Sequence, residues 1–302
     1  MNEQLHLLPT EQQNERTRHL DQKNIEEMLR LINQEDQLVP LVVEACIPQI
    51  ALAVAAIKHA IASGGRLIYF GAGTSGRLGI LDAAECPPTY GTDPGLVVGI
   101  IAGGTYAIQN AVEGAEDDEN GGSADVVNMN VTAADVVVGI SASGRTPYVV
   151  GAMKKALDLG CTVVGIANNR GSVMGSYASI MIEAEVGPEA ILGSTRMKAG
   201  TAQKLILNML TTASMVSSGK VYDNLMVDMK SSNEKLIKRA KRLIKLATSA
   251  DDAAIEQAYE ASGRHIKSAI VMILAGASAD EATKLLEQSG GFVEKAVRLA
   301  QN

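Results

Sequence analysis

The chain has 302 residues, of which 46% are hydrophobic and 20% are charged, a composition typical of a globular protein with a sizeable core. A formal net charge of −7, no Trp and only 2 Phe argue against nucleic-acid binding, which favours basic surfaces and aromatic stacking platforms. The 3 cysteines form no CxxC pair and indicate reduced thiols. Met1 to Thr17 lacks the apolar core of a signal peptide, and no apolar segment is long enough to span a bilayer. We therefore expect a cytoplasmic protein that binds neither nucleic acid nor membrane.

Helical patterns open the chain, and a strand-and-helix alternation follows them. Two long helices are expected at 22–33 and 35–62, within an N-terminal segment covering 1–65. Five short runs rich in Val and Ile follow, and their nearly continuous apolar character is typical of strands buried on both faces. These runs cover 66–70, 95–101, 135–141, 162–167 and 179–185. Helical patterns between and after them, such as 148–160 and 197–217, predict a doubly wound, five-stranded parallel α/β sheet over 66–230.

The C-terminal part, 231–302, is helical throughout and predicts an appended helical bundle. It begins with a basic amphipathic stretch at 233–247, a charge pattern typical of a solvated helix face. Two related strings follow, "EASGRHIKSAIVMI" (260–273) and "EQSGGFVEKAVRLA" (287–300), each a Ser-Gly turn before an apolar helix. Two copies are too few for a solenoid, so we expect a small bundle.

The first predicted strand runs into "FGAGTSGRLG" (70–79), a glycine-rich loop before a helix. Such a loop lets the backbone approach an anion, while the helix N-terminus offers free N–H groups. The glycines fit a dinucleotide fingerprint, which also requires an acidic residue at the end of the second strand. That strand ends in "IIAGGT", without a carboxylate, so a dinucleotide cofactor is not expected.

The third predicted strand ends in "ISASGRTPYVV" (140–150), a loop rich in hydroxyl groups. Ser141, Ser143 and Thr146 surround Gly144, and Pro147 suits the first turn of a helix. These residues could simply cap that helix. Two such loops at the carboxyl ends of parallel strands, however, favour a binding site for a phosphate ester.

A carboxylate in "LDAAECPPTYG" (81–91) raises a question of its own. Pro87 and Pro88 predict that a helix ends near Glu85, because proline disfavours helical geometry in the residue before it. A glutamate near a helix C-terminus opposes the helix dipole. Glu85 is therefore either the last polar residue of that helix or a group directed at a ligand.

Several strings in this sequence resemble a known family. "GAGTSGR" and "SASGRTP" resemble the signature loops of the sugar isomerase (SIS) domain, which binds phosphosugars. Further strings resemble the N-acetylmuramic acid 6-phosphate etherase family, with Gln13 where that family has a basic residue. They are "TEQQNERTRHLD" (10–21), "INQED" (32–36), "LDAAECPPTYG" (81–91), "VEGAEDD" (112–118), "LGSTRMKAGTAQK" (192–204) and "VYDNLMVD" (221–228), and together they span nearly the whole chain.

The resemblance implies a SIS-type, flavodoxin-like fold and a carbon–oxygen lyase. Such an enzyme removes D-lactate from carbon 3 of the sugar phosphate by elimination, and water then adds to give N-acetylglucosamine 6-phosphate. Neither a metal nor another cofactor is implied, and the 4 histidines are dispersed. By the same resemblance Glu85 is the acid and Glu116 the base. The residues themselves leave Glu113 open as the base. Glu113 and Glu116 lie three residues apart and could instead simply line one exposed helix face.

Substrate contacts are expected from residues of three loops, Thr74, Ser75, Gly76, Ser141, Ser143, Gly144, Thr146, Ser194, Thr195 and Lys198. Lys198 could instead be an exposed helix lysine. His265 is either an ordinary histidine or a group that assists ring opening from a neighbouring subunit. The resemblance further implies a homodimer with the site near the interface, whose shared surface would come from the helices before the sheet and 197–217.

Three other functions are weighed on the same fold. An aldose–ketose isomerase of phosphosugars would share the carbon 2 base and would need no acid at Glu85. A non-catalytic sugar-phosphate sensor like the glucokinase regulatory protein carries two SIS domains, whereas this chain has length for one. A SIS transcription regulator would need an N-terminal helix-turn-helix, which residues 1–65 do not show.

Overall fold

The computed structural model describes residues 8–230 and 233–301. Residues 1–7 of the polar N-terminal segment and the expected start of the bundle at 231 lie outside this part. The chain forms two compact units: residues up to Ala84 with Gly95–Thr211, and Glu85–Pro94 with the residues from Thr212 onward. This division differs from the expected limits at residues 65 and 230, which stay a prediction.

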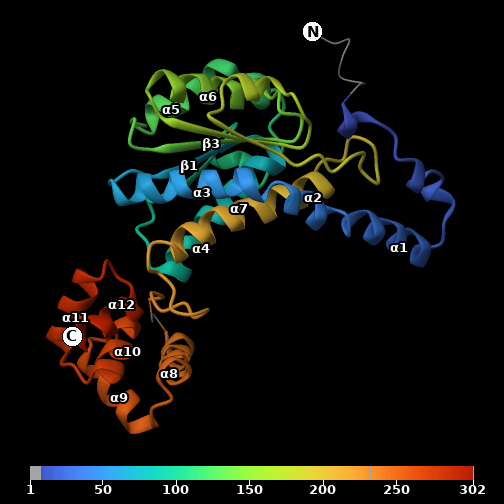
Figure 1. Cartoon of the computed structure of the whole chain (residues 1–302). Coiled ribbons are helices and arrows are strands. Elements are labelled where there is room, and N and C mark those ends of the chain that lie inside the picture. Colours follow the sequence, from blue (N-terminus) through green and yellow to red (C-terminus); the bar gives the residue numbers. More distant parts are fainter. Residues whose placement is uncertain (1–7, 231–232, 302) are drawn as a thin grey trace. The chain divides into compact units, whose positions relative to one another are not determined.

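The first unit is built on a parallel sheet (Figure 1). Within the described residues its five strands lie in the order β2-β1-β3-β4-β5, which is the flavodoxin-like order of a doubly wound fold. The strands are β1 (Leu67–Gly71), β2 (Val97–Ile101), β3 (Val136–Ser141), β4 (Thr162–Ala167) and β5 (Ile180–Glu183). All five predicted strands are thus confirmed, and so is the fold class.

Only the inner strands are buried as the sequence predicted. Every residue of β1 and β3 is buried, and β4 is buried beyond its first residue. The strands β2 and β5 lie at the edges of the sheet and are only partly buried. Each of these two strands has a strand neighbour on one side only, and a run of Val and Ile does not reveal such an edge position.

Helices cover both faces of this sheet. Helices α5 and α6 lie on one face, and α3, α4 and α7 lie on the other (Figure 1). The helices before, between and after the strands are α1 (Ile25–Asp36), α2 (Val39–Ala45), α3 (Ile47–Ala62), α4 (Gly73–Tyr90), α5 (Glu119–Asn128), α6 (Pro147–Asp158) and α7 (Lys198–Val216). One hydrophobic core of this unit forms between the sheet and the α5–α6 pair.

Prolines changed two of the predicted helices. The helix expected at 35–62 is divided into α2 and α3, because Pro48 in the first turn of α3 has no N–H to continue the preceding helix. In contrast, α4 continues through Pro87 and Pro88, so the predicted helix end near Glu85 is wrong. Both prolines lie in the last turn, where Gly91 N–H bonds to Pro87 O at 3.0 Å and Gly91 closes the helix with a φ of +63°.

The acidic stretch 116–120 is partly helical. The 3₁₀ turn η6 (Ala115–Asp117) carries its first residues, and α5 begins at Glu119. Asp118 caps α5 by accepting a hydrogen bond from Gly121 N–H. An Asp before a helix is a recognised N-cap, so a capping signal was present in this stretch.

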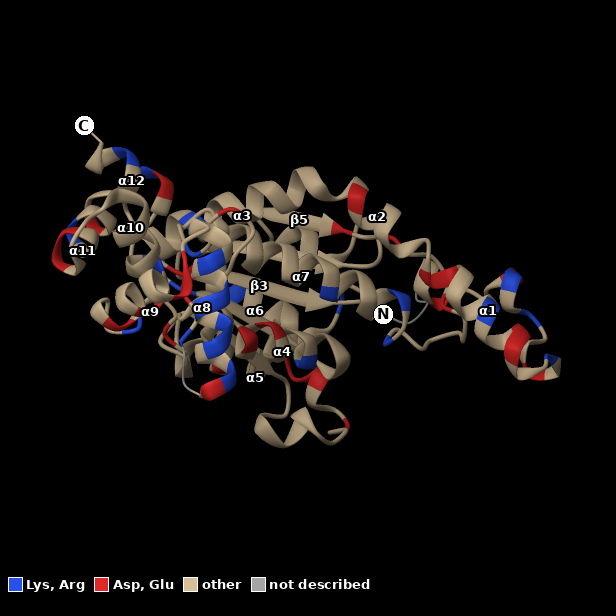
Figure 2. Cartoon of the chain, turned by 90° about the horizontal axis from the view of Figure 1, so that it is seen from below, with Lys and Arg blue, Asp and Glu red and all other residues tan. Residues whose placement is uncertain are grey.

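The second unit contains α8 (Glu234–Thr248), α9 (Asp252–Ala261), α10 (Ile266–Ala275), α11 (Ala279–Gln288) and α12 (Val293–Ala300), packed around their own core. Basic residues lie along α8 (Figure 2), and several pair with nearby acidic residues, as Lys245 does with Asp252. The internal repeat is confirmed as two matching turns before α10 and α12. Gly263 and Arg264 in the first turn, like Gly290 and Gly291 in the second, have positive φ.

Among the described residues, no single helix is both long and apolar enough to cross a membrane. One bent pair, Ile25–Ala45 with Ile47–Ala62, passes that test jointly across a bend of 61°.

Candidate active site

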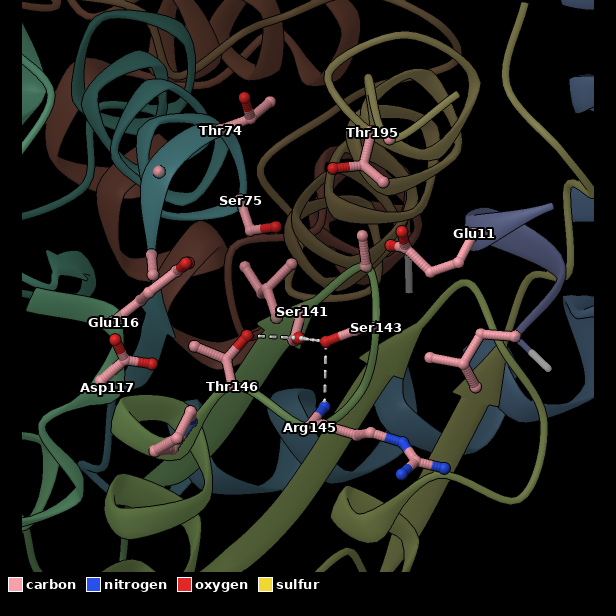
Figure 3. Close-up of a pocket in the computed structure, with 17 residues that line it drawn as sticks. Glu11, Thr74, Ser75, Glu116, Asp117, Ser141, Ser143, Arg145, Thr146 and Thr195 are labelled. Atoms are coloured by element: carbon pink, nitrogen blue, oxygen red, sulfur yellow. Dashed lines mark hydrogen bonds between the residues drawn. The ribbon is translucent and has the colours of Figure 1, made fainter. Parts of the chain in front are cut away.

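A cavity of about 470 Å³ lies in the first unit, where the loops after β1 and β3 meet. These strands are neighbours at the point where the strand order reverses, the usual ligand site of a doubly wound sheet. Figure 3 shows the side chains that line it. Polar members of this lining are Glu11, Thr74, Ser75, Glu116, Asp117, Ser141, Ser143, Arg145, Thr146 and Thr195.

The loop after β3 supplies three hydroxyl groups, and the hydroxyl of Ser141 contacts the other two. Ser141 Oγ lies 2.7 Å from Thr146 Oγ1 and 3.3 Å from Ser143 Oγ (Figure 3). Backbone N–H groups of Gly144 and Arg145 donate to Ser141 Oγ and Ser143 Oγ at 3.1 and 3.2 Å, respectively. Thr146 occupies the N-cap position of α6, yet its side chain makes no capping hydrogen bond. Capping therefore does not account for this hydroxyl, which stays available to a ligand.

Glycine is required in both loops for steric reasons. Gly144 has a φ of +67°, and a Cβ there would lie 2.4 Å from Ser172 Cβ. A Cβ on Gly76 would lie 2.6 Å from Ile101 Cγ1 and 2.8 Å from Gly71 O. Neither glycine lines the cavity, so both shape the loops.

The loop after β1 contributes Thr74 and Ser75 from the first turn of α4. Ser75 Oγ is buried and donates to Gln203 Oε1 of α7 at 2.9 Å. Gln203 in turn donates to Asn168 Oδ1 at 3.0 Å. This chain of hydrogen bonds fixes the Ser75 hydroxyl at the cavity wall.

Carboxylates approach the hydroxyl groups from two sides. Glu116 and Asp117 come from η6, and Glu11 comes from the 3₁₀ turn η2 (Pro9–Glu11) on the opposite side in Figure 3. Glu116 also lines a second, smaller cavity, whereas Glu113 lines only that smaller one. Of the two candidate bases, Glu116 is thus the one that the fold brings to the hydroxyl groups.

Glu85 is exposed on α4 and belongs to the second unit. It is not part of the lining of either cavity that contains Glu116. His265 also belongs to the second unit, where it caps α10 by accepting a hydrogen bond from Ser268 N–H. The predicted roles of Glu85 and His265 stay predictions.

The third predicted loop meets the cavity only in part. Thr195 lines it, and Ser194 does not. Lys198 is buried, with 1% of its side chain exposed, and its Nζ donates to Glu35 Oε2 at 2.7 Å and to Val186 O at 2.9 Å. The alternative of an exposed helix lysine is therefore wrong, and the fold does not bring Lys198 to the cavity either.

The N-terminus of α7 is likewise occupied by a protein group. Glu189 accepts hydrogen bonds from the N–H groups of Lys198 and Ala199, each at 2.9 Å. Burial raises the pKa of the Glu189 carboxyl, although these two bonds oppose that rise. A substrate phosphate therefore has no free N–H group at these two positions.

The N-terminal segment reaches the cavity through long-range contacts. Thr10 and Asn169 exchange side-chain hydrogen bonds, and Thr17 Oγ1 donates to Ala190 O at 2.8 Å. Asn14 Nδ2 donates to Pro188 O at 3.1 Å. These contacts bring Glu11 to the site, a residue of the family-like string 10–21 to which no role was assigned.

Sequence reasoning also missed Asp117 and Arg145 as lining residues. Asp117 follows Glu116 and Arg145 precedes Thr146, so their position beside predicted site residues was the signal that the sequence offered. Arg145 Nε is buried without a hydrogen-bond partner among the described residues. Glu11 lies in the family-like string 10–21, but more than 50 residues separate it from the first strand, so no local pattern placed it beside the sheet. As for metals, no three His, Cys, Asp or Glu side chains in the described part of the chain are grouped to hold one.

Two family models match overlapping parts of the chain. Residues 111–213 match the model of the SIS domain, and residues 49–157 match that of the glucokinase regulatory protein N-terminal SIS domain. The solved structure of a phosphoheptose isomerase from Francisella tularensis is 14% identical, with a TM-score of 0.48, over 64% of this chain and 99% of its own. By the family models, the sheet and its cavity are those of a SIS-domain protein.

Curated relatives define the chain further. An N-acetylmuramic acid 6-phosphate etherase of Escherichia coli O1:K1 is 56% identical over 97% of this chain and 99% of its own length. Another, from Caldanaerobacter subterraneus subsp. tengcongensis, is 53% identical over 97% of this chain and 95% of its own. The chain belongs to the N-acetylmuramic acid 6-phosphate etherase family.

Proposed function

We propose that this chain cleaves the D-lactyl ether of N-acetylmuramic acid 6-phosphate, giving N-acetylglucosamine 6-phosphate and D-lactate. The observation that carries the proposal is 53–56% identity to etherases over nearly the whole chain. The cavity is consistent with it, because hydroxyl groups that suit a phosphate ester lie beside a glutamate that can act as a base.

The phosphate would bind at the loop after β3. Ser141, Ser143 and Thr146 present hydroxyl groups there, and Ser75 and Thr195 line the same cavity. Hydroxyl donors at a strand-to-helix turn hold a phosphate without a lysine, as does the positive end of a helix dipole. The geometry does not support the substrate contact expected from Lys198. The contact expected from Ser194 is supported only by the position of its neighbour Thr195 in the cavity lining.

The chemistry requires one base and one acid. In the open-chain sugar the aldehyde at carbon 1 acidifies the carbon 2 proton. Glu116 takes that proton, a carbon 2–carbon 3 double bond forms, and the carbon 3–oxygen bond breaks with its electron pair moving to the lactate oxygen. The family resemblance assigns the proton for that oxygen to Glu85, which lines neither cavity in the structure. Water then adds its oxygen to carbon 3, and a proton returns to carbon 2.

The direct test is incubation of the purified chain with N-acetylmuramic acid 6-phosphate in ¹⁸O-water. We expect D-lactate, and N-acetylglucosamine 6-phosphate with one solvent oxygen at carbon 3. Absence of lactate would refute the activity, and a ketose phosphate in its place would indicate an isomerase. Lactate without solvent oxygen in the sugar would refute the elimination scheme.

Hydrogen exchange at carbon 2 in deuterated water distinguishes the role of Glu116 as base from that of Glu85 as acid. Glu116→Gln should slow both exchange and lactate release by about 10²- to 10⁴-fold. Glu85→Gln should slow lactate release far more than exchange. Exchange that survives Glu116→Gln would transfer the role of base to Glu113, and equal losses in the Glu85 variant would remove Glu85 as the acid.

The remaining expectations are part of the same proposal. We place the protein in the cytoplasm, consistent with buried cysteines at 46, 86 and 161 that are thiols rather than disulfides. We also propose a homodimer whose shared surface includes α2 and α3, where large apolar side chains are exposed.

A further inference from the structure

The smaller cavity beside the candidate base has no role in the mechanism above. Its volume is about 200 Å³, and it shares Ala72, Gly73 and Glu116 with the larger cavity. Small side chains such as Ala107 and Ala111 line much of the remainder. One water takes about 30 Å³ of liquid volume, so the space admits a group of several heavy atoms.

Arg77 supplies a positive charge to this cavity. Its Nε donates to Ile108 O at 2.8 Å and its Nη2 donates to Asn110 O at 2.9 Å. Both acceptors are neutral carbonyls, and no carboxylate among the described residues forms an ion pair with this guanidinium. A guanidinium with remaining donors in a cavity wall is well suited to binding a carboxylate.

We infer that the smaller cavity binds the lactyl group of the substrate, with its carboxylate against Arg77; this inference rests on the proposed etherase function. The substrate carries an anion at each end of its reacting part, the phosphate on carbon 6 and the carboxylate on the carbon 3 ether. The hydroxyl groups of the larger cavity match the first, and Arg77 matches the second. Glu116 lines both cavities and is therefore placed at the carbons between the two anions.

Glu113 lines the same small cavity, and its negative charge opposes a bound carboxylate. Arg77 must outweigh that repulsion. Glu113→Gln should therefore raise the ratio of kcat/KM for the natural substrate to kcat/KM for an analogue without the charge. A ratio that falls would count against the inference.

The main test compares two substrates, N-acetylmuramic acid 6-phosphate and its lactamide analogue, in which a neutral amide replaces the carboxylate. In Arg77→Met we expect kcat/KM to fall about 10- to 100-fold for the carboxylate substrate, the usual effect of losing a charged hydrogen bond. For the amide it should fall no more than about threefold. Equal losses for both substrates would overturn the inference.

Because Arg77 also holds the backbone near 108 and 110, a second variant tests the cavity without removing these bonds. Ala111 is exposed, and Ala111→Leu should fill part of the cavity and raise KM for the lactyl substrate about tenfold. Gln109→Leu, at an exposed position outside the lining, is the matched control and should leave KM unchanged. An unchanged KM in Ala111→Leu would contradict the inference.

Exchange of the carbon 2 proton of N-acetylglucosamine 6-phosphate distinguishes failure of the lactyl-binding inference from failure of the proposed etherase function. This sugar has the phosphate and no lactyl group, so its exchange should stay within about twofold in both Arg77→Met and Ala111→Leu. Loss of exchange in both variants would show damage to the site and overturn the inference. If the wild-type chain releases no lactate, the proposed function itself fails.

Discussion

At the scale of single residues, an ion-pair network centred on the buried Glu35 joins the N-terminal segment to α7. Glu35 accepts hydrogen bonds from Arg16 Nη2 at 3.0 Å and from Lys198 Nζ at 2.7 Å. Burial alone would raise the pKa of Glu35, but its hydrogen bonds to Arg16, Lys198 and Asn14 outweigh burial and lower the pKa to about 2. The network orients the segment that carries Glu11 and holds Lys198 away from the cavity.

This network predicts a loss of stability in acid. A lowered pKa means that the Glu35 carboxylate stabilises the folded state fully above about pH 5, and that this contribution disappears as pH falls toward 2. Glu35→Gln leaves Lys198 buried without its anion, which should cost about 3 kcal/mol in the free energy of unfolding at pH 7. The gap between wild type and variant should narrow between pH 5 and pH 2.5 in urea titrations.

Glu15→Gln is the matched control for this measurement. Glu15 pairs with Arg18 at the surface, where an ion pair contributes little. Its loss should change stability by less than about 0.5 kcal/mol at any pH. If the gap for Glu35→Gln is the same at pH 2.5 as at pH 7, the assigned ionisation is wrong.

At the scale of elements, α5 and α6 pack with their backbones in close approach. A Cβ on Gly122 would lie 1.9 Å from Tyr148 O, and a Cβ on Gly151 would lie 1.9 Å from Glu119 O. Tyr148 Oη also donates to Asp125 Oδ2 at 2.6 Å across the same helix pair. The two glycines are thus explained by packing rather than by turn geometry.

Gly122→Ala should therefore destabilise the protein by about 2–4 kcal/mol, because the helices must separate to admit the methyl group. Urea unfolding monitored by circular dichroism measures the effect. Gly175→Ala is the control, since a Cβ at Gly175 meets no atom within 4 Å, and it should change stability by less than about 1 kcal/mol. Similar values for the two variants would show that α5 and α6 can move apart freely.

At the scale of the whole molecule, the proposed homodimer predicts a sensitive surface on α2 and α3. Leu41 and Leu52 are 63% and 60% exposed, and Ile47 is also exposed. In a two-fold symmetric dimer the same surface of both subunits forms the interface, so Leu52→Asp would place two charges in it, one from each subunit. We expect it to weaken the dimer by at least tenfold, measured by analytical ultracentrifugation.

Leu157→Asp serves as the control for this experiment. Leu157 is 44% exposed on α6, on the opposite face of the sheet from α3, and its replacement should leave the dimer intact. A monomeric wild-type chain, or a dimer unaffected by Leu52→Asp, would disprove the proposed surface.

Much of the fold could be predicted from the sequence because the signals are local. The five Val- and Ile-rich runs, the helical patterns between them and the glycine- and hydroxyl-rich loops all appear in short windows. Parallel strands bring their carboxyl ends to one edge, so the loops at Gly71–Ser75 and Ser141–Thr146 were expected together. The extent of α4 was missed, because the effect of Pro87 and Pro88 depends on their place in the last turn.

The sequence by itself therefore determined the parallel sheet, its hydroxyl-bearing loops and the family to which the chain belongs. Tertiary structure alone decided that Glu11 enters the cavity, that Lys198 is buried against Glu35, and that Glu116 lies between two cavities. The physical reason is distance along the chain. The contact between Lys198 and Glu35 joins positions 163 residues apart, and no local pattern of polarity or helix propensity carries information about such a contact.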